Sequence, residues 1–155
     1  MSKLVRSVVL FAGAAALVAS RVYAGSDSLV VVVANGPLAG TYKAPEQDII
    51  CGHEMPPKYQ NPGYAVTWRR FTGYAAKELG EAAMEVSNPD KLGVKRVMVD
   101  ISFGDPDHDP TNYHIFTDAV TFKLGGGGFT MEFDGKTDKG IRLRVTASCS
   151  NVEEM

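Results

Sequence analysis

Residues 141–149, near the end of the chain, alternate strictly between apolar and polar side chains. One face carries Ile141, Leu143, Val145, Ala147 and Cys149, and the other carries Arg142, Arg144, Thr146 and Ser148. A period of two predicts a half-buried β-strand, because successive side chains of a strand point to opposite sides. The strand needs a second layer over its apolar face, and Cys149 lies on that face.

The only other cysteine in the chain is Cys51. In an exported protein a lone pair of cysteines predicts a disulfide rather than a metal site or a nucleophile. A bond between Cys51 and Cys149 would pin the end of the chain to its first third. The alternative is two separate buried thiols.

The N-terminus has the features of a secretory signal peptide. Lys3 and Arg6 supply a positive start, residues 7–20 are almost uninterruptedly apolar, and Val22-Tyr-Ala24 ends in a small residue. We expect residues 1–24 to be removed, which leaves residues 25–155 as a single domain without a stable membrane span. The predicted location is the periplasm or the extracellular space, and the alternative is an uncleaved membrane anchor.

The expected mature chain is acidic. Without the signal, 13 of the 16 basic residues remain against 18 acidic ones, a formal charge of −5. Nucleic-acid binding depends on phosphate contacts from basic side chains, so no nucleic-acid partner is predicted. A protein or a carbohydrate is the expected partner, and self-association is also compatible with the sequence.

Further short apolar segments bounded by glycine, proline and asparagine predict strands throughout the chain. They comprise residues 29–34, 41–44, 47–51, 64–71, 94–103, 113–124 and 129–133. The first is continuously apolar, which predicts a strand buried on both sides. The pattern as a whole predicts an all-β fold, mostly an antiparallel β-sandwich of about seven to nine strands.

One segment departs from the period of two. Apolar residues between positions 75 and 86 recur at spacings of three and four, with Glu and Lys between them. This spacing predicts a short amphipathic helix near residues 73–86, in which Gly80 is unfavourable. A strand over residues 83–87 is the alternative.

Residues 129–133 and 141–149 are expected to form an antiparallel hairpin. With Phe133 opposite Ile141, all apolar side chains share one face, and Glu132 faces Arg142 on the other. A slip by one residue would destroy both matches.

Two motifs resemble a pattern found in small exported bacterial β-sandwich domains of uncharacterised function. The first is Gly36-Pro-Leu-Ala-Gly-Thr-Tyr42 followed by Cys51, and the second is Phe133-Asp-Gly-Lys-Thr-Asp-Lys-Gly140 followed by Cys149. The resemblance covers the two ends of the expected domain and implies fold and export, but no activity.

Two groups of residues are candidate metal ligands. Asp105, Asp107 and Asp109 alternate in a loop, as oxygen ligands of Ca²⁺ do, but Pro110 and Phe116 stand where an EF-hand has glycine and glutamate. The alternative is a solvated turn. His53, His108 and His114 would form a Zn²⁺ or Cu²⁺ site if their loops converged, although their spacing matches no ligand motif.

Trp68 is a candidate for an aromatic platform that binds a sugar or a peptide, together with Arg69, Arg70 and three tyrosines, Tyr59, Tyr64 and Tyr74. The alternative, a core tryptophan, is favoured, because a lone Trp in the middle of a sandwich strand is usually buried.

No nucleophile motif is present, so the sequence favours a protein without catalytic residues. The predicted function is an exported binding or structural module that recognises its partner through loops. One alternative is a small metal-dependent hydrolase built on His53, Asp105, Asp107, His108 and His114. Another is a self-assembling extracellular subunit that pairs through an exposed edge such as residues 29–34.

Overall fold

The computed structural model describes residues 26–53, 63–87 and 96–154. The predicted signal peptide, residues 1–24, and most of the proline-rich loop, residues 54–62, lie outside these ranges. No helix within the described ranges is long and apolar enough to cross a membrane.

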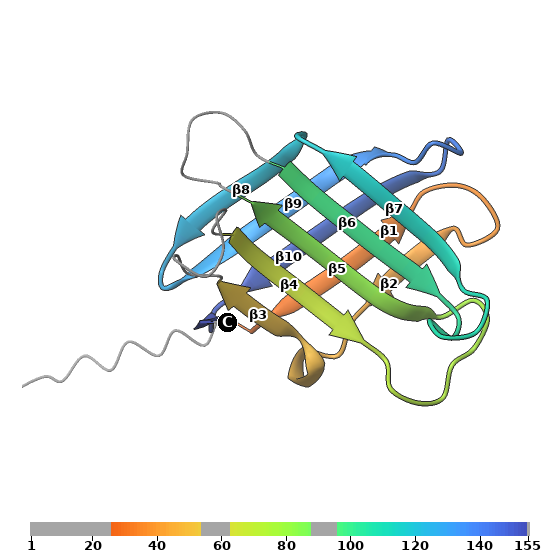
Figure 1. Ribbon diagram of the computed structural model, residues 1–155, viewed down its shortest axis with the longest axis horizontal. Helices are drawn as coiled ribbons and strands as arrows, with labels where there is room; N and C mark the ends of the chain where they lie inside the picture. Colours follow the sequence, from red (N-terminus) through yellow and green to blue (C-terminus); the bar gives the residue numbers. More distant parts are fainter. Residues whose placement is uncertain (1–25, 54–62, 88–95, 155) are drawn as a thin grey trace, which may run out of the picture.

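Within the described ranges eleven strands form two sheets, as predicted for an all-β sandwich. The first sheet has five antiparallel strands in the order β2-β1-β10-β9-β8 (Figure 1). Its members are β1 (Ser28–Val33), β2 (Gly40–Lys43), β8 (Val120–Gly125), β9 (Gly128–Lys136) and β10 (Arg142–Cys149).

The second sheet has six strands in the order β11-β3-β4-β5-β6-β7. Its members are β3 (Ile50–His53), β4 (Gly63–Arg69), β5 (Leu79–Ser87), β6 (Arg96–Phe103), β7 (Thr111–Thr117) and β11 (Glu153–Glu154). All neighbours are antiparallel except β11, which pairs with β3 in parallel. A single 3₁₀ turn, η1 (Glu46–Asp48), precedes β3.

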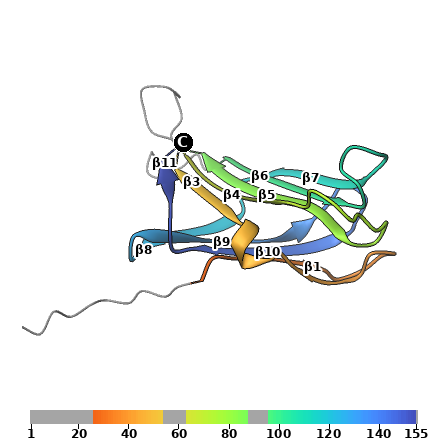
Figure 2. The same cartoon turned by 90° about the horizontal axis from the view of Figure 1, so that it is seen from below.

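The two sheets lie face to face and enclose one apolar core (Figure 2). The alternation predicted for the last strand is present in β10, where Leu143 and Val145 are fully buried while Arg142 and Arg144 are exposed. The largest buried side chains come from both sheets and include Phe103, Phe129, Phe133, Leu29, Met84, Ile101 and Met131.

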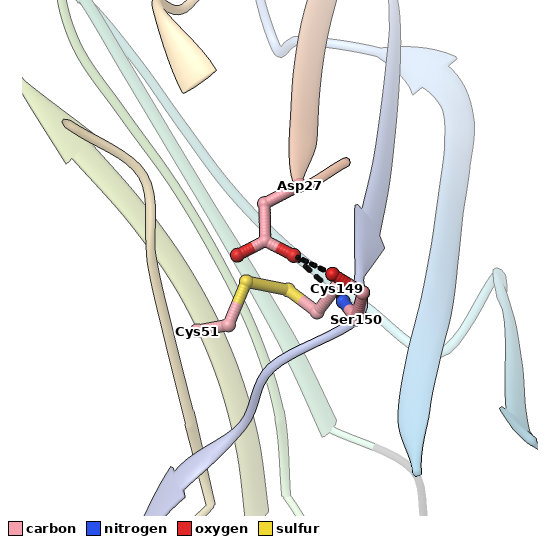
Figure 3. Close-up of a disulfide and its surroundings, with 4 residues drawn as sticks. All are labelled: Asp27, Cys51, Cys149 and Ser150. Carbon is pink, nitrogen blue, oxygen red and sulfur yellow. Dashed lines mark hydrogen bonds between the residues drawn. A yellow bond between two sulfur atoms is a disulfide. The ribbon is translucent and has the colours of Figure 1, made fainter. Parts of the chain in front are cut away.

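The predicted disulfide between Cys51 and Cys149 is present and joins β3 of one sheet to the end of β10 in the other (Figure 3). Its Cα atoms are 5.9 Å apart, a usual separation for a disulfide. Ser150 beside it donates two hydrogen bonds to Asp27, 2.6 Å from the backbone nitrogen and 2.8 Å from Oγ. The start of β1, the end of β10 and β3 are thus fastened at one corner.

The helix predicted near residues 73–86 is wrong, because residues 79–87 form strand β5. Ala82, Met84 and Val86 point into the core at a period of two. A register shift between Leu79 and Glu81 interrupts the alternation of buried and outward residues in β5. Leu79 and Ala82 are therefore both buried although they are three residues apart, a spacing typical of a helix. Pairing with β4 and β6 on both sides outweighs the helix propensity of the alanines.

The first strand differs from its prediction in two respects. β1 alternates between buried and half-buried side chains, so only one of its faces lies in the core. It also lies between β2 and β10, and is therefore not an exposed edge available for pairing between copies. Edge positions belong to β2 and β8 in one sheet and to β11 and β7 in the other.

The predicted hairpin register is wrong by four residues. Phe133 lies opposite Val145 rather than Ile141, because β9 continues to Lys136 and the turn closes between Thr137 and Ile141. Side chains alternate between the two faces of a strand, so a shift by four residues leaves each of them on the same face. The apolar faces of β9 and β10 therefore still coincide. The expected Glu132–Arg142 pair is replaced by a 2.6 Å ion pair between Arg144 and Asp134.

Replacement of both Cys51 and Cys149 by alanine is expected to lower the free energy of unfolding by roughly 2–5 kcal/mol. The bond closes a loop with a sequence separation of 98 residues, and the chain-entropy model gives about 4.7 kcal/mol for a loop of about this size. Urea denaturation of both proteins, each with and without reductant, measures the difference. Reductant should shift only the wild-type midpoint, and equal midpoints without reductant would contradict the prediction.

Candidate functional site

His53 lies far from the other two histidines proposed as transition-metal ligands, His108 and His114. His53 ends β3 and stacks on Tyr64 at 4.3 Å between ring centroids. Strand pairing places His53 in the same row as Val97 of β6, and β6 continues to Phe103, about 20 Å further at 3.3 Å per residue. The Asp-rich loop with His108 begins only after this point, at the other end of the sheet (Figure 1).

The aspartates proposed as calcium ligands mainly contact other protein groups. Asp105 accepts hydrogen bonds from the backbone nitrogen of Asp107 at 3.0 Å and from the ring of His108 at 2.8 Å. Asp107 forms a 2.7 Å ion pair with Arg69, and Asp109 is exposed in a left-handed conformation. Nowhere among the described residues do three or more His, Cys, Asp or Glu side chains come together as a metal site.

Trp68 lies in the core, as its favoured interpretation predicts, and is only 4 % exposed. Arg70 lies 6.0 Å from its ring centroid. Tyr64 packs against Phe122 and Phe129 at the other end of the sheet, and Tyr59 lies outside the described residues. No exposed aromatic platform forms around Trp68 in the described part of the chain.

On the outer face of β5, β6 and β7 lies a hollow in which several polar side chains converge. It has a volume of about 260 Å³. We call it the Ser102 cleft, and its lining includes Glu81 of β5, Asp100 and Ser102 of β6, Asn112 and His114 of β7, and Pro106 of the loop between β6 and β7.

Strand register brings these side chains into two rows. Ser102 lies between Glu81 on β5 and Asn112 on β7. In the next row Asp100 lies opposite His114, whose Nδ1 atom is in hydrogen-bond contact with the Asp100 carboxylate. All five side chains point outward, because the residues between them on each strand face the core.

Ser102 is the unusual member of the cleft. It is 7 % exposed, although it lies on the outer face of the sheet. Its Oγ atom makes no hydrogen bond to any described residue. Leaving a buried hydroxyl without a partner costs about 1–3 kcal/mol, and among the described residues only the Trp68 Nε1 atom in the core shares this situation.

The loop after β6 folds back against β5 at this end of the sheet. Gly104 donates a 3.0 Å backbone hydrogen bond to Glu78, and the Arg69–Asp107 ion pair holds the middle of the loop to β4. Gly80 permits this approach, because a Cβ atom there would lie 2.1 Å from the carbonyl oxygen of Gly104. The loop thereby places Pro106 at the wall of the cleft.

The side chains of the cleft include groups that only accept hydrogen bonds and groups that both donate and accept them. Glu81 makes no hydrogen bond to the described residues, although its charge contributes to raising the pKa of Arg69 after the larger effect of Asp107. Ser102 and the Asn112 amide supply both functions. The arrangement suits a polar ligand that itself donates and accepts hydrogen bonds.

A catalytic triad is not assembled in the cleft. Asp100 and His114 are joined, but the hydroxyl of Ser102 is hydrogen bonded to neither His114 nor any other described residue. A serine nucleophile requires a base within about 2.6–3.2 Å. The geometry therefore supports binding better than nucleophilic chemistry.

Of the residues that line this cleft, only His114 was predicted from the sequence as a site residue. Glu81 lies in the segment expected to be helical, and Ser102 and Asn112 belong to no motif. Their outward positions are readable from the alternation of β6 and β7, but their proximity depends on pairing between strands distant in sequence. One sequence signal was available: Ser102 is a small polar residue between two core positions, two residues before the Gly-Asp-Pro turn that begins at Gly104.

Comparisons with protein-family models, with curated proteins and with solved structures found no match to this chain.

Replacement of Gly80 by alanine is expected to destabilise the protein by about 1–3 kcal/mol, because the added Cβ collides with the backbone of Gly104. Thermal and urea unfolding measure the loss. Gly125→Ala is the matched control, since a Cβ there has no neighbour within 4 Å. Equal unfolding midpoints for the two variants would show that the loop does not depend on the contact.

The pKa of Asp105 is expected below the ordinary value of about 3.9, mainly because the Asp107 backbone N–H donates to its charged form and secondly because of His108. A lowered pKa in the folded state contributes stability above the unfolded pKa, and this is lost as the pH falls through the folded pKa. Titration of the carboxyl carbon by NMR measures the value. A midpoint at or above about 3.9 would contradict this account of the loop.

Proposed function

We propose that this protein is an exported, non-catalytic binding module that holds its ligand in the Ser102 cleft. The observation that carries the proposal is the Ser102 hydroxyl, which is buried at the wall of the cleft and has no hydrogen-bond partner among the described residues. A ligand in the cleft would supply the missing partner if the Ser102 side chain rotated towards it, and this would offset the cost of the buried hydroxyl.

Export is part of the proposal and is supported by two features. The N-terminal residues have the composition of a secretory signal. The disulfide is buried and closes the sandwich, and such bonds persist mainly in oxidising compartments. The resemblance to small exported bacterial β-sandwich domains agrees with this location.

The two alternatives have less support. The hydrolase would need His53 beside the Asp-rich loop, but these lie near opposite ends of the six-stranded sheet. Self-assembly through β1 would need a free edge, and β1 is an interior strand. A binding role through the cleft requires neither a metal nor a rearranged sheet.

Titration of ¹⁵N-labelled, disulfide-bonded protein tests the proposal. Four probes represent the ligand classes: glucose oligomers, a primary amine, a dipeptide and Ca²⁺. We expect at least one of them to shift the amide signals of Ser102, Asn112 and His114 saturably. Ser102→Ala should weaken that binding about five- to tenfold, the effect of one hydrogen bond.

The same variant separates binding from folding. Because the Ser102 hydroxyl has no partner among the described residues, Ser102→Ala should leave the stability unchanged or raise it. Ser148→Ala, the same change on the outer face of the other sheet, should affect neither property. The proposal fails if no probe shifts the cleft signals, or if Ser102→Ala and Ser148→Ala bind equally.

A further inference from the structure

Phe116 is a large aromatic side chain that the fold leaves in solvent beside the Ser102 cleft. It is 73 % exposed and lies on the outer face of β7, two residues beyond His114. The rings of Phe116 and His114 are 4.5 Å apart and nearly perpendicular, with an interplanar angle of 83°. The aromatic surface therefore continues directly from the wall of the cleft.

Met98 extends this apolar area onto the neighbouring strand. It lies opposite Phe116 in the β6–β7 register and is half-buried on the same face. From Asn112 to Phe116 is four residues along one strand, or about 13 Å. The face thus presents a polar cleft at one end and an aromatic surface at the other, separated by the length of a short oligomeric ligand.

We propose that this continuous surface binds a neutral oligosaccharide, with one sugar ring in the Ser102 cleft and another stacked on Phe116. The inference rests on the proposed binding function and specifies the class of ligand.

Sugar hydroxyls both donate and accept hydrogen bonds, as Ser102 and Asn112 require, and they also donate to the free carboxylate of Glu81. The C–H face of a sugar ring is complementary to the negative face of an aromatic ring.

Other ligand classes fit the two halves of the surface less well. An acidic ligand would be repelled by Glu81 and Asp100. The basic side chains described nearby already contact carboxylates, Arg69 that of Asp107 and His114 that of Asp100. A free metal ion would make no use of Phe116. A neutral sugar chain uses both the polar cleft and the aromatic surface.

Affinity electrophoresis and calorimetry with neutral polysaccharides and their oligomers test the inference on the disulfide-bonded protein. The probes are β-glucans, α-glucans, xylans and mannans. We expect saturable binding to at least one of them. Phe116→Ala should weaken it about tenfold by removing the stacking surface, and Phe116→Trp should retain it.

Phe71→Ala is the matched control, because Phe71 is a phenylalanine of similar exposure, 79 %, and does not line the cleft. Both alanine variants should unfold at the wild-type temperature, since neither side chain is in the core. Equal loss of binding in both variants would overturn the role of Phe116. If the amine or the dipeptide shifts the cleft signals and no sugar does, the oligosaccharide inference falls while the binding function stands.

Discussion

The covalent bond between Cys51 and Cys149 is the constraint around which the sandwich is arranged. It joins β3 to β10 across the core, and the chain then crosses from one sheet to the other to place β11 beside β3. The Asp27–Ser150 hydrogen bonds add the start of β1 to the same corner. The net stability of a folded domain is only about 5–15 kcal/mol, so one bond that closes a loop with a sequence separation of 98 residues contributes a large share.

The Ser102 cleft lies on the side of the six-stranded sheet away from this corner, on strands β5, β6 and β7. Because these strands are paired along their whole lengths, the side chains in the cleft are placed by a rigid backbone rather than by a mobile loop. A rigid site loses little conformational entropy when its ligand binds. A buried hydroxyl without a partner, such as that of Ser102, is unfavourable in the free protein, and departures of this kind from good packing are found mostly at functional sites.

The sequence predicted what depends on local periodicity and missed what depends on pairing. The inward residues of β6 and β10, the disulfide and the sandwich architecture follow from alternation and from two cysteines. The helix near residues 73–86 was wrong because a bulge beside Gly80 disguises the period of two. β1 was predicted to be buried on both faces because valine occurs on both faces of the strand. In the structure one face lies in the core and the other is half-buried. None of these errors changed the fold class, because each concerned one element within the same layers.

The hairpin error shows why the site was harder to predict than the fold. A shift of four residues between β9 and β10 leaves every apolar side chain on the correct face, so burial alone cannot distinguish the two registers. The actual register follows from the turn at Thr137 to Ile141. The same applies to the cleft, where a shift of two residues between β6 and β7 would keep the core intact but move Asn112 away from Ser102. Burial therefore determines which face of a sheet a side chain occupies. The turns and the bulge at Gly80 determine which polar side chains lie next to each other, and the proposed ligand site depends on these neighbours.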